Sequence, residues 1–140
     1  MRNYFRMLLV AAVSTFLLSS GPTSANAADE GIIPGASISA NVAIVNEYRW
    51  RGLDQSATQA AIQGGFDLAH TSGLYIGTWL SNVDFGQVKT STEFDYYAGF
   101  GFEAAGIGVD LNVTQFSYPG SADTNNNDFV EYGVGLSKDF

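Results

Sequence analysis

From residue 37 to the C-terminus, apolar and polar residues alternate with a period of two, and the 3.6-residue period of an amphipathic helix is absent. Neighbouring side chains of a strand point to opposite faces, so this alternation predicts strands with one apolar and one polar face. Six strands are predicted, over residues 37–51, 60–69, 73–82, 92–102, 107–118 and 129–140. The facing of the third strand, 73–82, is ambiguous, because aromatic and aliphatic residues occupy both of its faces.

The connections between these strands alternate between long and short. The segments "HTSG" (70–73) and "EAAG" (103–106) predict tight turns that end in glycine, whereas 52–59, 83–91 and 119–128 are longer and polar. In an antiparallel meander, alternate connections lie at the same end of the sheet. All long loops are therefore expected at one end, which is typical of an outer-membrane barrel with short periplasmic turns and longer extracellular loops. A soluble sandwich or a lipocalin-like barrel is the alternative.

The polar faces indicate which side of the sheet is enclosed. In a membrane barrel the apolar face turns outward to lipid and the polar face lines the lumen, whereas a soluble β-protein has the reverse arrangement. Glycines share the polar faces with the charged residues; glycine weakens an exposed strand, but it makes room for neighbouring side chains in a narrow lumen. We therefore predict that the polar faces point inward. The predicted lumen-lining residues are Glu47, Arg49, Arg51, Gln63, Asp67, Glu93, Asp95, Asp110 and Glu131.

The segment "NEYRWRG" (46–52) alternates arginines with aromatic residues. In a continuous strand, Tyr48 and Trp50 share the apolar face near the end that carries the long loops, so we predict them, with Tyr132, in an aromatic girdle at the membrane interface. Arg49 and Arg51 then point into the lumen, away from lipid. An edge strand of a soluble sheet with a charged outer face is the alternative.

The N-terminus has the features of a secretory signal peptide. Two arginines precede an apolar run over residues 7–18, and "ANA" (25–27) predicts cleavage before Ala28. The apolar run is shorter than the roughly 20 residues that a membrane-spanning helix requires. The expected organisation is a signal peptide over 1–27 and a single outer-membrane β-barrel domain over 28–140.

Charge and composition exclude several classes of function. Residues 28–140 contain four basic and fourteen acidic residues, a formal charge of −10, so a nucleic-acid partner is not expected. The chain has no cysteine, which excludes disulfides, thiolate metal sites and a thiol nucleophile.

Catalytic and metal motifs are weak. His70 is the only histidine; a dyad with Asp67 or Ser72 is conceivable, but a turn-capping role is favoured. The segment "DTNNND" (123–128) begins like a calcium loop but has Asp128 where that loop requires glycine. We predict no enzymatic activity, no metal site and no cofactor.

Several segments together resemble the TorF-type porin family of proteobacterial outer-membrane proteins: "NVAIVNEYRWRGLDQS", "AIQGGFDLAHTSGLYIGTWLSNVDF", "EFDYYAGF", "FSYPG" and "EYGVGLS". The resemblance covers about residues 41–136. It implies an antiparallel up-and-down transmembrane β-barrel and a pore, with no enzymatic residues and no substrate. Members of that family continue through further strands, and single-chain bacterial barrels use eight or more. The domain is therefore expected to be incomplete at its C-terminus, or else to close across several copies of the chain as a homo-oligomer.

These observations predict a porin that admits small polar solutes by passive diffusion, with outer-membrane lipid as its surroundings. The predicted inward faces carry six acids against two arginines, so an open lumen should prefer cations. The alternatives are a non-conducting small barrel, a soluble periplasmic β-sheet protein with a binding or structural role and, more remotely, an outer-membrane hydrolase.

Overall fold

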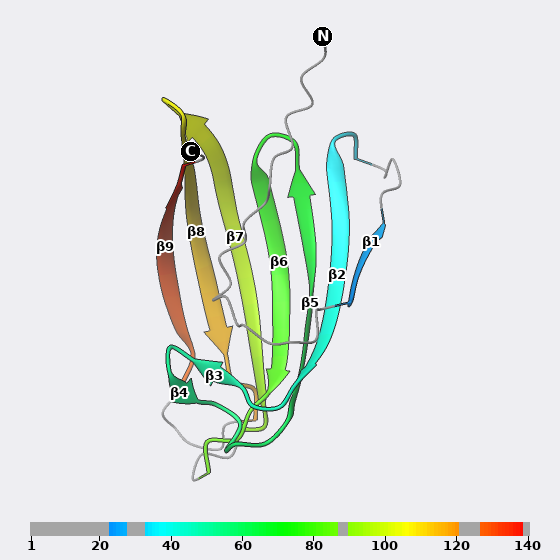
Figure 1. Cartoon of the computed structure of the whole chain (residues 1–140), viewed down its shortest axis with the longest axis vertical. Coiled ribbons are helices and arrows are strands. Elements are labelled where there is room, and N and C mark those ends of the chain that lie inside the picture. Colours follow the sequence, from blue (N-terminus) through cyan, green and yellow to red (C-terminus); the bar gives the residue numbers. More distant parts are fainter. Residues whose placement is uncertain (1–22, 28–32, 87–89, 121–126, 139–140) are drawn as a thin grey trace.

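A computed structural model describes residues 23–27, 33–86, 90–120 and 127–138. Within these ranges the chain is all-β, and its main element is one antiparallel sheet with the strand order β1-β2-β5-β6-β7-β8-β9 (Figure 1). The sheet strands are β1 (Thr23–Ala27), β2 (Ala36–Val45), β5 (Ala61–His70), β6 (Leu74–Asn82), β7 (Thr92–Ala104), β8 (Ile107–Ser117) and β9 (Phe129–Ser137). The short strands β3 (Arg49–Trp50) and β4 (Leu53–Asp54) form a separate hairpin.

The prediction of an all-β antiparallel meander is confirmed. Consecutive sheet strands from β2 onward pair with each other, and β5 to β8 agree with the predicted segments to within two residues at each end. The edges of the sheet, β1 and β9, do not pair with each other among the described residues. Strand β1 comes from the last five residues of the predicted signal peptide, so cleavage before Ala28 would leave β2 as the edge strand. The rest of that predicted peptide lies outside the described residues.

The two faces of the sheet differ sharply in exposure. Large apolar side chains on one face, here called the outer face, are open to the surroundings: Val42 is 57% exposed, Phe66 63% and Val134 73%. The opposite face, here called the inner face, buries Glu93 at 2% and Asp95 at 6% exposure. A water-soluble sheet protein normally buries its apolar face, so this distribution is the reverse of the usual one.

Strand β6, whose facing the sequence left ambiguous, has the same division into an exposed aliphatic outer face and a more buried inner face. Leu74 and Ile76 are more than half exposed on the outer face, whereas Tyr75 is 7% exposed and lies on the inner face. The third predicted strand therefore presents its aliphatic residues outward and its aromatic residues, Tyr75 and Trp79, inward.

The predicted difference between the two ends of the sheet is also present. The β7–β8 connection is a tight turn in which both Ala105 and Gly106 have positive φ, the conformation of a two-residue hairpin loop. The β5–β6 turn is closed by the hydrogen bond from the Gly73 N–H to the His70 carbonyl. The connections after β2, β6 and β8 gather at the opposite, lower end of the sheet in Figure 1. Residues 87–89 of the second connection and 121–126 of the third, including "DTNN" (123–126), lie outside the described residues.

The predicted continuous strand over residues 37–51 is wrong. Strand β2 ends at Val45, the last residue paired with β5, and a bend at Asn46 and Glu47 turns the chain away from the sheet. Residues 49–54 then form the β3–β4 hairpin, which lies across the lower end of the inner face (Figure 1). Because alternation between faces holds only within one continuous strand, the side chains beyond the bend do not keep the predicted facing.

Glycines on the inner face let tyrosines reach acids on more distant strands. The Tyr75 ring of β6 lies over Gly99 of β7, and its hydroxyl donates to Asp110 Oδ2 of β8 at 2.9 Å. In the opposite direction, the Tyr97 ring of β7 lies over Gly77 of β6, and its hydroxyl donates to Asp67 of β5. Each tyrosine therefore spans three strands, and the glycine between the two partners provides the space, as the sequence predicted for crowded inner faces.

This arrangement predicts that Gly99→Ala destabilises the fold. The added Cβ would overlap the Tyr75 ring and displace it from Asp110, and overpacking of this kind costs about 1–3 kcal/mol. The matched control is Gly101→Ala, two residues further along the same face, where the nearest atom to a new Cβ is Asp110 Oδ2 at 3.9 Å. Urea unfolding followed by tryptophan fluorescence should show a lower midpoint for the first variant only. Equal midpoints for the two variants would contradict the packing described.

Candidate functional site

The β3–β4 hairpin owes its shape to a two-residue turn. Arg51 (φ 50°) and Gly52 (φ 84°) both have positive φ, as in a type I′ turn, and Trp50 pairs with Leu53 across it. Glycine adopts this conformation without strain. An Xaa-Gly pair between two short alternating segments is typical of a hairpin turn. The Arg51-Gly52 pair in "WRGLD" is therefore a sequence signal for this hairpin, and the prediction of a continuous strand over 37–51 did not use it.

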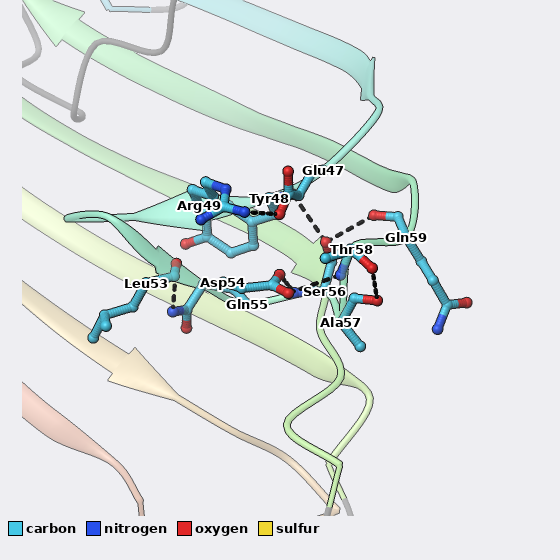
Figure 2. Close-up of polar contacts among 10 residues, drawn as sticks. All are labelled: Glu47, Tyr48, Arg49, Leu53, Asp54, Gln55, Ser56, Ala57, Thr58 and Gln59. Carbon is cyan, nitrogen blue, oxygen red and sulfur yellow. Dashed lines mark hydrogen bonds and ion pairs between the residues drawn. The ribbon is translucent and has the colours of Figure 1, made fainter.

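Local hydrogen bonds hold the chain in this arrangement after it leaves the sheet (Figure 2). The Tyr48 N–H donates to Ser56 Oγ at 2.9 Å, and the Tyr48 carbonyl accepts the Gln55 N–H at 2.8 Å. The Asp54 carboxylate accepts the N–H groups of Ser56 and Thr58 at 3.0 and 2.8 Å. The N–H and carbonyl of Tyr48 are thus satisfied within residues 48–59 instead of by a neighbouring strand, and the Gln55 carbonyl accepts the Asp84 N–H at 2.8 Å.

Tyr48 fastens the beginning of the hairpin to the inner face. Its side chain is 9% exposed, its ring meets Trp79 edge to face at 5.4 Å, and its hydroxyl donates to Glu93 Oε1 at 2.8 Å. Burial, reinforced by the adjacent Glu93 carboxylate, raises the pKa of the Tyr48 hydroxyl above its usual value. The hydroxyl therefore stays protonated and remains a donor to Glu93. Tyr48 also belongs to a small apolar cluster with Ala61 and Val83.

Trp50 fastens the tip of the hairpin. Its ring meets Phe116 of β8 at 5.9 Å and Phe129 of β9 at 6.3 Å, and these two rings stack on each other at 4.5 Å. The predicted girdle positions of Tyr48 and Trp50 are therefore wrong, because the bend after Val45 turns both side chains onto the inner face. Tyr132, the third residue of that prediction, does lie on the outer face, where it is 85% exposed.

The two arginines pair with carboxylates. Arg49 lies 2.5 Å from Glu47 Oε1, and the Arg51 guanidinium donates two hydrogen bonds to Glu131 of β9, at 2.8 and 2.6 Å. The second pair joins the hairpin to the edge of the sheet. Both pairs are substantially exposed, so each is expected to contribute at most about 1 kcal/mol to stability.

The hairpin and the inner face enclose a cavity of about 360 Å³, within the size range of small-molecule sites. Six of the nine predicted lumen-lining residues border it: Glu47, Arg49, Arg51, Gln63, Asp95 and Glu131. The other three, Asp67, Glu93 and Asp110, lie on the inner face but accept tyrosine hydroxyls instead of bordering the cavity.

The cavity also has aromatic walls, and four of their rings were not among the predicted site residues. The lining rings of the inner face and the hairpin segment are Tyr48, Trp50, Tyr75, Trp79, Tyr97 and Phe116. The four rings that the sequence analysis missed are Tyr75 and Trp79 of β6, Tyr97 of β7 and Phe116 of β8. The sequence pattern that could have identified them is their place on the same strand faces as the predicted lumen-lining residues.

His70, the residue of the remote hydrolase alternative, lies in the β5–β6 turn, at the end of the sheet opposite the hairpin. Its Nδ1 lies 2.8 Å from Ser72 Oγ and its Nε2 lies 3.1 Å from the Pro34 carbonyl oxygen. These contacts are those of a turn-capping residue. Across the described part of the chain, no group of three or more histidine and acidic side chains is placed to hold a metal ion.

Fold and site together define an all-β protein whose antiparallel sheet exposes its apolar face and encloses a polar and aromatic cavity beneath a hairpin. Residues 29–140 match the family model Gcw_chp, described as a bacterial protein of unknown function, and the chain belongs to this family. No curated protein and no solved structure was found to match it. Within the described residues there is no helix of the length and apolarity needed to cross a membrane.

Proposed function

We propose that this sheet is the wall of an outer-membrane porin of the TorF type, through which small polar solutes diffuse. The observation that carries the proposal is the inverted distribution of side chains. The outer face exposes long apolar residues such as Ile44 at 70% and Leu136 at 73%, whereas carboxylates and hydroxyls occupy the inner face. Exposure of such an apolar face is favourable in a lipid bilayer, because its side chains then contact acyl chains instead of water.

The position of the β3–β4 hairpin would limit the width of such a lumen. Tyr48, Trp50 and Arg51 reach across the inner face to contact β6, β7, β8 and β9. A segment in this position narrows the passage at the end that carries the long loops. It therefore favours a restricted pore over a wide one, and a small barrel that does not conduct is the second candidate.

Membrane insertion is tested with the purified full-length protein in detergent. A folded barrel should migrate faster on SDS gels before boiling than after it, and removal of detergent should cause aggregation. A protein that stays monomeric and folded without detergent would refute the membrane proposal and favour a soluble β-protein.

If the lumen conducts, it should prefer cations. The inner-face residues identified from the sequence comprise six acids and two arginines, and charged groups along a pore set its selectivity. Reversal potentials across planar bilayers in a potassium chloride gradient should therefore indicate cation preference, and Asp67→Asn combined with Asp110→Asn should reduce it. A preference for anions would contradict the prediction, and the absence of any conductance from correctly inserted protein would favour the non-conducting barrel.

A further inference from the structure

Two residues of the cavity lining, Glu47 and Asp95, have a buried carboxylate oxygen without a hydrogen bond within the described structure; Glu47 forms an ion pair with Arg49, whereas Asp95 has no ion-pair partner there. Asp95 is 6% exposed, and its Oδ1 atom is buried with no hydrogen-bond partner among the described residues. A buried carboxylate oxygen without a partner is costly, and native structures normally supply a donor or an ion to such an atom. Asp95 also borders the cavity, so a donor could reach it from there.

The strand register surrounds this carboxylate with aromatic rings. Asp95 of β7 pairs with Trp79 of β6 on one side and with Phe116 of β8 on the other, and all three border the cavity. Tyr97 lies two residues further along the same face, and Tyr48 packs against Trp79 from the hairpin above. A single acid is thus enclosed by rings from three strands and the hairpin.

The other charges that border the cavity are already paired. Arg49 pairs with Glu47 and Arg51 with Glu131, which leaves Asp95 as the acid in the cavity lining that has no ion-pair partner. Neither arginine forms an ion pair with Asp95 in the described structure. An anionic solute would find no free cationic partner in this lining, because both arginines are already paired. A hard metal ion requires several oxygen ligands, and no group of three or more histidine and acidic side chains in the described part of the chain is placed to supply them.

Carboxylate and aromatic rings together match the chemistry of an organic ammonium ion. The charged nitrogen donates hydrogen bonds to the carboxylate, and the ring faces attract the cation and cover its alkyl groups. We propose that the cavity beneath the β3–β4 hairpin binds a small organic ammonium ion, with Asp95 as its counter-ion and Trp79, Phe116 and Tyr48 as its walls. The proposal extends the proposed function by naming a class of solute for the restricted pore. Transport of this solute rests on the proposed function, whereas its binding to the cavity does not.

The two tryptophans of the chain provide the measurement, because both Trp50 and Trp79 border the cavity. The full-length protein in detergent is titrated with n-butylammonium chloride and, separately, with 1-butanol, which has the same alkyl chain without the charge. We expect a saturable change in tryptophan fluorescence with butylammonium only. Equal responses to the two compounds, or no response to butylammonium, would overturn the proposal without the need for any variant.

The variant Asp95→Asn keeps the shape of the side chain and removes its charge. Butylammonium affinity should fall at least about 30-fold, as for other desolvated charge pairs that lose one partner. The control Glu103→Gln removes an exposed acid at the opposite end of β7 and should bind as the unaltered protein does. Unchanged affinity in Asp95→Asn would overturn the proposal.

Binding and conduction are measured separately, so the two proposals can fail independently. Conductance without butylammonium binding would refute the ammonium site and leave the porin proposal standing. Butylammonium binding without conductance would support the site and refute transport.

Discussion

Replacing Phe66 by arginine is expected to destabilise the protein by about 2–4 kcal/mol in a phospholipid bilayer. Phe66 lies at the middle of β5, on the outer face, and is 63% exposed. In lipid, an arginine at that depth must desolvate its charge or deform the bilayer. In water the same substitution at so exposed a position should change stability by no more than roughly 0.5 kcal/mol. The loss of stability caused by this substitution is therefore expected to be several-fold larger on a lipid-facing surface than on a water-facing one.

The matched control is Leu53→Arg. Leu53 is 64% exposed, almost the same as Phe66, but it lies in the β3–β4 hairpin, off the outer face of the sheet. The free energy of unfolding from phospholipid vesicles, measured by urea titration and tryptophan fluorescence, should fall for Phe66→Arg and not for Leu53→Arg. Similar, small effects of the two substitutions would contradict a lipid-facing outer face.

Replacing Trp50 by alanine is expected to release the β3–β4 hairpin. The substitution removes the ring contacts with Phe116 and Phe129, and loss of a packed tryptophan costs about 3 kcal/mol, the low end of the usual range because Trp50 is half-buried. If this cost falls on hairpin docking, the undocked fraction rises by about 100-fold. The Arg51–Glu131 pair alone is too exposed to compensate.

Limited proteolysis measures this release directly. Trypsin cleaves after arginine, and both Arg49 and Arg51 lie within the hairpin segment. When opening and closing are faster than cleavage, the cleavage rate follows the open fraction, so it should rise steeply in Trp50→Ala. The control is Leu53→Ala, which alters the exposed partner of Trp50 in the same hairpin. If both variants are cleaved at the same rate, Trp50 does not anchor the hairpin.

Most of the sheet could be predicted from the sequence because its strands alternate without interruption. In β7, Glu93, Asp95 and Tyr97 occupy one face while Phe94 and Tyr96 occupy the other, and the structure has the same division. The tight turn after β7 was predicted for a related reason, since Gly106 supplies a positive φ at no steric cost. Both signals are local, so they remain visible in a single chain.

The candidate site was predicted only in part, because it depends on contacts between distant segments. Arg51 and Glu131 were each assigned to the inner face, but their direct pairing across 80 residues was not predicted. The sequence pattern predicts Tyr48 and Trp50 on the outer face only if residues 37–51 form one continuous strand, and the structure divides this segment into β2 and β3. The sequence could not show that the backbone of Tyr48 pairs with Ser56 and Gln55 instead of a neighbouring strand.

The sequence by itself determined which residues form strands and which faces are apolar, because a period of two places alternate side chains on opposite sides of any continuous strand. Only the tertiary structure decided that the chain leaves the sheet at Val45, turns at Arg51 and Gly52, and encloses a cavity against Asp95. The physical reason is that the hairpin is stabilised by Tyr48 against Glu93 and by Trp50 against Phe116. These contacts join residues 45 or more positions apart, and no local pattern encodes them.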